Sequence, residues 1–208
     1  MQKYSGMMMK RVVSVVLVVV FQGSEGVAPA AEVLEGRTLF VCDSAADRVM
    51  RFTDLDGSGA IEPGAPGEIV VYYDASGGGP ELSVPSHLAV GGDEELYLLD
   101  GGTLDAILVL ADANGDGDAA DPGEARVFYD RSAFGPRLST PNTLLVLPDG
   151  SLYVSDDGSR ARRILRLEDT NGDGDALDEG EAVVVFDPSS LADVVPEDLE
   201  SLAVLPDG

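Results

Sequence analysis

The feature that most constrains this chain is an aspartate- and glycine-rich segment that recurs at an almost fixed interval. It reads DANGDGDAADPGE at 112–124 and returns as DTNGDGDALDEGE at 169–181, while a degenerate copy, DLDGSG, occupies 54–59. The first aspartates, Asp54, Asp112 and Asp169, are spaced 58 and 57 residues apart. Self-similarity at a period of this length is typical of a repeat architecture, in which each repeat is one supersecondary unit. The spacing therefore predicts a repeat protein with about three units.

Side-chain oxygens at alternate positions of each copy predict a calcium site. Oxygens at loop positions 1, 3 and 5, followed by glycine at position 6, suit a hard cation, because alternate side chains point inward and the glycine lets the backbone turn. Without a cation, so many neighbouring carboxylates would repel one another. The alternative is a solvated turn that merely favours Asp, Asn and Gly. The predicted ligands are Asp54, Asp56 and Ser58 in the first copy, Asp112, Asn114, Asp116, Asp118 and Asp121 in the second, and Asp169, Asn171, Asp173, Asp175 and Asp178 in the third.

The loops differ from the calcium loop of a helix-loop-helix hand. That loop carries a bidentate glutamate at position 12, where this chain has Gly123 or Gly180. We expect Asp121 and Asp178 to close the coordination shell instead. The glutamates at position 13, Glu124 and Glu181, are expected to neutralise the rim of each site.

Short apolar runs surround each loop in the same order. Runs of four to six β-branched and apolar residues between Gly, Pro and Asp clusters predict strands, and the chain after residue 30 shows no convincing helical period. Four strands per unit without helices predict an all-β fold, a β-propeller with about three four-stranded blades. The runs lie at 39–43, 48–52, 68–73 and 86–90 in a unit of about 38–95, at 96–100, 106–110, 125–129 and 142–147 in a unit of about 96–151, and at 152–156, 163–167, 182–186 and 201–205 in a unit of about 152–208.

One segment supports a resemblance to known propellers. It reads PNTLLVLPDGSLYVSD at 141–156, and 85–100 echoes it. This pattern resembles the NHL-repeat and gluconolactonase/regucalcin-like six-bladed propellers, and the acidic loops resemble those of dockerin-like modules. A six-bladed fold exceeds three units, so we interpret the chain as a fragment of a larger propeller. If the chain is complete, its two open sheet edges need another chain to cover them, for example by self-association.

The resemblance also implies a central metal site. In the gluconolactonase/regucalcin-like enzymes, Glu, Asn and Asp side chains at the starts of inner strands hold one divalent metal at the mouth of the channel. In this chain Asn142 matches the asparagine, Ser86 and Glu200 occupy equivalent positions, and Asp198 is nearby. The alternative is that Asn142 and Glu200 satisfy turn or backbone groups at a blade edge.

The first thirty residues predict a signal peptide. Lys3, Lys10 and Arg11 form a basic start, 12–21 is an apolar run, and Ala-Pro-Ala at 28–30 predicts cleavage before Ala31. The alternative, an uncleaved anchor, is disfavoured because spanning a bilayer needs roughly 20 apolar residues. We therefore expect blades at 31–208 in a secreted or periplasmic protein, with no membrane contact after cleavage. Calcium there is abundant enough for weak loops with Kd of about 10⁻⁴ to 10⁻³ M.

Charge and cysteine content limit the partners and the covalent structure. The formal net charge of −25 excludes nucleic acid and anionic lipid as sensible partners. A hydrophobic content of 44% excludes a disordered acidic tail. Cys42 is the sole cysteine, so no intrachain disulfide forms, and we expect it to be a small buried residue.

These observations favour a secreted calcium-binding β-propeller module with a structural or ligand-binding role, whose partner is an unknown protein or carbohydrate. The alternative is a metal-dependent lactonase or esterase-like hydrolase with Asn142 and Glu200 in the central metal shell. His87, the only histidine, has no nucleophile motif beside it and is expected to be half-buried at a strand start. The four arginines of 160–166 are expected to pair with the neighbouring acidic loops.

Overall fold

The described part of the computed structural model consists of β-strands joined by turns and loops. It covers residues 17–20, 38–92, 95–158, 161–188 and 196–204, so the predicted leader lies outside it apart from 17–20. None of the described residues forms a helix long and apolar enough to cross a membrane. The strands are β1 (Leu17–Val20), β2 (Thr38–Asp43), β3 (Arg48–Thr53), β4 (Ile69–Tyr73), β5 (Pro85–Val90), β6 (Leu96–Asp100), β7 (Ala106–Leu110), β8 (Ala125–Tyr129), β9 (Pro141–Val146), β10 (Leu152–Gly158), β11 (Ala161–Leu167) and β12 (Ala182–Phe186).

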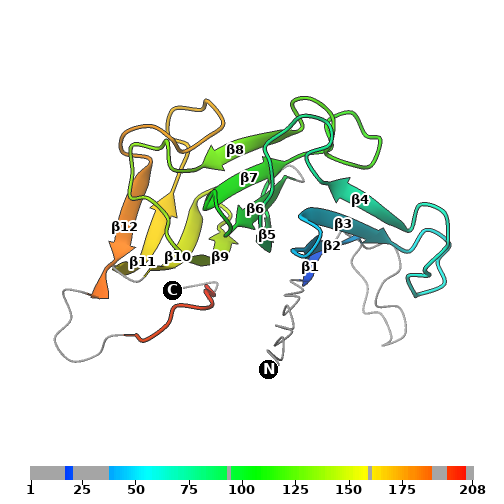
Figure 1. Cartoon of the computed structure of the whole chain (residues 1–208), viewed down its shortest axis with the longest axis horizontal. Coiled ribbons are helices and arrows are strands. Elements are labelled where there is room, and N and C mark those ends of the chain that lie inside the picture. Colours follow the sequence, from blue (N-terminus) through cyan, green and yellow to red (C-terminus); the bar gives the residue numbers. More distant parts are fainter. Residues whose placement is uncertain (1–16, 21–37, 93–94, 159–160, 189–195, 205–208) are drawn as a thin grey trace, which may run out of the picture.

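The strands form three antiparallel four-stranded sheets, each in chain order: β1-β2-β3-β4, β5-β6-β7-β8 and β9-β10-β11-β12. Figure 1 shows them side by side in an arc, with β1, β5 and β9 toward its centre and β4, β8 and β12 at its periphery. Strand β2 contacts β5, and β5 contacts β9. Sheets of this kind are propeller blades, so the predicted all-β fold with three blades is confirmed. The sheets are called blades 1, 2 and 3 below.

The blades are offset by one strand from the repeat units read in the sequence. The run at 86–90, placed last in the unit 38–95, is β5 and opens blade 2. The physical reason is the turn after it: Gly91 N–H donates to the Glu95 carbonyl at 2.8 Å, closing a tight hairpin between β5 and β6. The connection from β4 to β5, residues 74–84, is longer and carries the chain to the next blade.

Eleven of the twelve predicted runs are strands, β2 to β12. The run at 201–205 was predicted wrongly, because residues 201–204 form no regular structure and residue 205 lies outside the described part. A strand needs a neighbour to satisfy its backbone groups. The equivalent strands β5 and β9 pair with the strand that follows them, whereas none of the described strands pairs with 201–204.

The two middle strands of blade 2 are buried on both faces. Every residue of β6 and β7 is buried. Since neighbouring side chains of a strand point to opposite faces, Leu98 and Leu108 pack in one cluster with blade 1, including Cys42, as predicted for that residue. Leu99 and Ile107 pack in a second cluster with blade 3. The core therefore lies between the blades.

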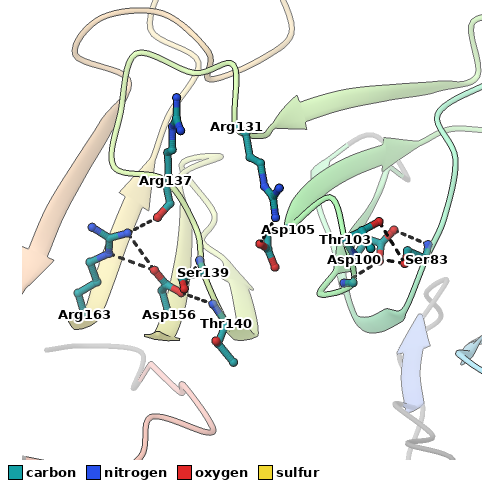
Figure 2. Close-up of polar contacts among 11 residues, drawn as sticks. Ser83, Asp100, Thr103, Asp105, Arg131, Arg137, Ser139, Thr140, Asp156 and Arg163 are labelled. Atoms are coloured by element: carbon teal, nitrogen blue, oxygen red, sulfur yellow. Dashed lines mark hydrogen bonds and ion pairs between the residues drawn. The ribbon is translucent and has the colours of Figure 1, made fainter. Parts of the chain in front are cut away.

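Two buried aspartates hold the connections between blades (Figure 2). Asp100 accepts hydrogen bonds from the N–H groups of Ser83 and Val84 at 2.8 and 2.7 Å. Asp156 accepts equivalent bonds from residues 139 and 140 at 2.9 and 2.8 Å, and it pairs with Arg163 at 2.9 Å. Both aspartates are fully buried. They tie each connection to the second strand of the blade that it enters.

Candidate metal centre

The three acidic loops each join the third strand of a blade to the fourth. Loop 1 is residues 54–68, loop 2 is 112–124 and loop 3 is 169–181. All three are closed by the same backbone bond, from the residue before the loop to the carbonyl of its last glutamate. These bonds measure 2.9 Å to Glu68, 2.8 Å to Glu124 and 2.9 Å to Glu181. Each loop is therefore an extension of a β-hairpin, as the strand-flanked motif predicts.

The carboxylate of the first aspartate in each loop accepts hydrogen bonds from backbone N–H groups of the same loop. In loop 2, Asp112 Oδ1 accepts from the N–H groups of Gly115 and Asp116 at 2.8 and 3.1 Å, and Oδ2 accepts from Gly117 at 2.9 Å. Gly115 and Gly117 have φ of 79° and 102°, a region that favours glycine. Asp54 makes the three corresponding bonds in loop 1, and Asp169 makes those from the two glycines in loop 3. The repeated motif therefore fixes the same turn three times.

The last glutamate of each loop lies beneath it. Glu124 is 5% exposed; its Oε1 accepts from the N–H groups of Ala113 and Asn114 at 3.0 and 3.1 Å, and its Oε2 from Asp121 at 3.2 Å. Glu68 and Glu181 are likewise buried and bind loop amides. The expectation that Glu124 and Glu181 neutralise an exposed rim is wrong. Because these glutamates stand directly before the fourth strand, their side chains lie beneath the loop. There they accept hydrogen bonds from backbone N–H groups near both ends of the loop.

Two of the loops bring three carboxylates together. Oxygens of Asp116, Asp118 and Glu124 lie within 4.8 Å of one another, and so do oxygens of Asp54, Asp56 and Glu68. Within the described ranges, loop 3 does not form a third group at this spacing. Sequence reasoning missed Glu68 and Glu124 as members of these groups. The signal that could have found them is the glutamate that stands before the fourth strand in all three repeats.

Asp121 and Asp178, which were predicted to close the coordination shell, accept hydrogen bonds from asparagine side chains. Asn114 donates from Nδ2 to Asp121 at 2.6 Å and to Asp116 at 3.2 Å. Asn171 makes the same bond to Asp178 at 2.7 Å. The structure therefore brings Asp116 and Asp118 together with Glu124, while Asp121 pairs with the asparagine at position 3.

The donor set fits a hard divalent cation. Every group in the two clusters is a carboxylate, and calcium takes six to eight oxygens at about 2.3–2.6 Å, so two oxygens of one shell lie at most about 5 Å apart. The 4.8 Å spacing satisfies that limit. In loop 1, hydrogen bonds from the backbone and hydroxyl of Ser58 lower the pKa of Asp56, which favours the ionised ligand. These acidic clusters can hold a metal ion.

Loops 2 and 3 also dock on the preceding blade. Ala119 N–H donates to the Tyr72 carbonyl in β4 at 2.8 Å, and Ala176 N–H donates to the Phe128 carbonyl in β8 at 2.8 Å. Both alanines are completely buried. The ladders skip a residue at Tyr72 and at Phe128, which is a β-bulge that leaves a residue outside the regular pairing. Each of these loops therefore lies at a junction between blades.

The arginines of β11 pair within their own blade. Arg162 contacts Asp157 at 3.1 Å, Arg163 contacts Asp156 at 2.9 Å, and Arg166 contacts Glu168 at 2.7 Å. The expectation that they pair with the acidic loops is wrong for Arg162 and Arg163, because antiparallel pairing places Asp157 and Asp156 of β10 directly opposite. Arg166 pairs with the residue that directly precedes loop 3. The fourth, Arg160, lies outside the described residues.

Asn142 and Ser86, two residues of the candidate central metal site, donate hydrogen bonds to backbone carbonyls. Asn142 donates from Nδ2 to the Leu199 carbonyl at 3.2 Å, and Ser86 donates its hydroxyl to the Leu99 carbonyl at 3.2 Å. Asp198 and Glu200 are exposed, and among the described residues neither joins a carboxylate group with metal-like spacing. Asn142 thus satisfies a backbone group, the alternative considered from the sequence.

His87 is half-buried at the start of β5, as expected. Its Nε2 lies 3.2 Å from Thr143 Oγ1 of β9, and burial lowers its pKa. The histidine therefore joins the inner strands of blades 2 and 3.

No family model matches the chain, and no curated protein matches it. Solved structures do show similarity. A chain of a nidogen/laminin complex shares 17% identity at a TM-score of 0.46, over 76% of this chain and 46% of its own length. Virginiamycin B lyase from Staphylococcus aureus shares 16% at 0.43, over 76% and 42%. A gluconolactonase from Xanthomonas campestris shares 24% at 0.43, over 64% and 40%. The chain spans less than half the length of each of these structures.

Proposed function

We propose that this chain is a calcium-binding β-propeller module of an exported protein, in which calcium in the acidic loops stabilises the junctions between blades. The observation that carries the proposal is the position of loop 2. Its carboxylate cluster, Asp116, Asp118 and Glu124, flanks Ala119, whose N–H binds the Tyr72 carbonyl of the preceding blade. A cation bound to this cluster would fix the segment that joins the two blades.

The energetics support a structural role. Carboxylates within 4.8 Å repel one another unless a cation neutralises them, and the whole chain carries a formal charge of −25. A ligand that binds the folded state alone stabilises it by about 2.7 kcal/mol at a hundredfold excess over Kd. Two clusters filled independently would give about twice that value. Calcium binding at extracellular concentration would therefore contribute a substantial part of the free energy of unfolding.

The module serves as a structural or ligand-binding element for a protein or carbohydrate partner. Export rests on the basic and apolar residues of 1–30 and the Ala-Pro-Ala site before Ala31. Cleavage there would remove β1 and leave blade 1 with β2, β3 and β4. The loops lie on the periphery of the arc (Figure 1), so calcium stabilises the scaffold while the inner strands stay available for a ligand. The resemblance of the loops to dockerin-like modules accords with this use of calcium.

Calcium titration by isothermal calorimetry, with thermal melts in calcium and in EDTA, tests the proposal. We expect saturable binding and a higher Tm in calcium. A variant combining Asp116→Asn with Asp118→Asn is expected to lose the loop 2 site and part of the Tm increase. The matched control combines Glu81→Gln with Glu197→Gln, which removes two exposed charges away from the loops. Identical melts in calcium and EDTA would sink the proposal.

A further inference from the structure

The side chain of Arg51 lies against loop 2, which belongs to the next blade. Arg51 stands on β3 of blade 1, yet two of its guanidinium nitrogens lie 2.7 Å from the position of a Cβ on Gly117, the sixth residue of loop 2. In the chain, Gly117 stands between Asp116 and Asp118, which supply two of the three carboxylates of the loop 2 cluster. A positive charge from blade 1 therefore adjoins the acidic site of blade 2.

The next junction repeats this arrangement. Arg126, on β8 of blade 2, donates from Nε to the carbonyl of Gly174 at 3.1 Å, and Gly174 is the sixth residue of loop 3. The two arginines come from different strands of their blades. They share one register, because Arg51 is paired with Val70 and Arg126 with Val109 between the third and fourth strands. Both junctions thus place one arginine of the preceding blade against the sixth residue of an acidic loop.

The two arginines differ in their other contacts. Arg126 pairs with Glu95 of its own blade at 2.8 Å, so a carboxylate outside loop 3 balances its charge. Blade 1 has Thr38 at the position that corresponds to Glu95. The ion pairs among the described residues do not include Arg51, and its Nε is buried without a hydrogen-bond partner among them. The charge of Arg51 is therefore not balanced within blade 1.

The ionisation of Tyr72 depends on Arg51 and on loop 2 together. Burial and the charge of Asp112 raise the pKa of Tyr72 to about 12, while the charge of Arg51 acts in the opposite direction. Glu124 adds a smaller effect of the same sign as that of Asp112. Because all three charges act on one hydroxyl, the guanidinium lies within electrostatic range of the carboxylates of loop 2.

We propose that Arg51 is the counterion of the metal-free loop 2 and that it lowers the affinity of this loop for calcium. The inference rests on the calcium-binding role proposed above. Without metal, the guanidinium offsets the repulsion among the loop 2 carboxylates and holds the loop against blade 1. When calcium binds, the same guanidinium repels the added positive charge. The coupling is reciprocal, so the stabilisation that Arg51 gives to the metal-free loop is lost from the affinity for calcium.

Calcium titration followed by the backbone amide NMR signals of Gly117 and Gly174 tests the inference loop by loop. In Arg51→Gln, which removes the charge, we expect the Kd at Gly117 to fall by about tenfold, equivalent to about 1.4 kcal/mol. The Kd at Gly174 should stay unchanged. Arg51→Lys keeps the charge and is expected to keep the Kd at Gly117 within about threefold of wild type. The matched control is Arg48→Gln, which removes the same charge from the same strand, where Arg48 pairs with Asp43 at 2.9 Å.

Thermal unfolding in EDTA tests the metal-free state. We expect Arg51→Gln to melt about 2–4 °C below Arg48→Gln, because the carboxylates of loop 2 then repel one another without a counterion. Calcium should raise the Tm of Arg51→Gln by more than it raises the Tm of the wild-type chain, since the variant binds calcium more tightly.

Two results of the titration would overturn the inference. A Kd at Gly117 that is unchanged or higher in Arg51→Gln would show that the arginine does not compete with the cation. An Arg51→Lys chain that binds calcium as tightly as Arg51→Gln would show that the effect does not depend on charge. If the signals of Gly117 and Gly174 in the wild-type chain do not respond to calcium, the proposed function fails instead. The melts in EDTA then decide the counterion by themselves, and an Arg51→Gln chain that melts with Arg48→Gln would overturn it.

Discussion

Replacing the buried glutamate of loop 2, Glu124→Gln, tests whether this residue organises the loop. The carboxylate is 5% exposed and accepts three backbone hydrogen bonds, two at Oε1 and one at Oε2. Glutamine keeps an oxygen for Ala113 and Asn114, but it presents an amide N–H₂ to the N–H of Asp121. One hydrogen bond is lost, and two donors then face each other in a buried place.

The magnitude follows from these contacts. A hydrogen bond to a charged group contributes about 1.5–3 kcal/mol, and an unsatisfied buried donor costs about 1–3 kcal/mol. Because part of the loop can relax toward solvent, we expect a net loss of about 2 kcal/mol in the free energy of unfolding. For a chain of 208 residues, this corresponds to a decrease in Tm of about 4–8 °C.

Thermal unfolding in EDTA is the appropriate assay, because it removes any contribution of Glu124 to metal binding. Glu179→Gln, an exposed glutamate in loop 3, is the matched control and is expected to change Tm by less than about 1 °C, as surface substitutions usually do. A Glu124→Gln chain that melts with the control would refute the structural role of the buried glutamate.

Further predictions concern the blade junctions and the core. Gly77→Ala would place a Cβ 1.6 Å from the Ala120 carbonyl oxygen. We expect it to lower the free energy of unfolding in urea by about 1–3 kcal/mol. The control Gly92→Ala adds a Cβ that meets no atom within 4 Å and should leave the urea midpoint nearly unchanged. Tyr129→Phe removes the 2.7 Å bond to the Pro136 carbonyl and is expected to cost about 0.5–1.5 kcal/mol in the same assay, so an unchanged midpoint would count against that bond. Burial raises the pKa of Cys42 to about 12, so iodoacetamide at pH 8 should label this thiol only after denaturation. Rapid labelling of the folded chain would show that Cys42 is accessible to solvent.

Much of the secondary structure and part of the candidate site could be read from the sequence. The apolar runs between Gly, Pro and Asp clusters located eleven strands, because strand formation depends on local side-chain patterns. The repeated Asp-x-Asn/Asp-Gly motif located the turn in each loop, because the first carboxylate binds amides a few residues away. The pairing of β5 with β6 was missed, because a repeat period fixes the length of a unit and leaves its starting point open.

The sequence by itself determined what depends on neighbouring residues: the strands, the turn geometry of the loops and the oxygen-rich chemistry suited to calcium. Tertiary structure alone decided the burial of Glu124, its position beside Asp116 and Asp118, and the docking of Ala119 on Tyr72. These features depend on how the loop folds over its own hairpin and against another blade. The contacts of Glu124 join residues within one hairpin and form only when the loop folds over itself. The contact of Ala119 with Tyr72 joins two blades, and its hydrogen bond and packing exist only when the blades stand side by side.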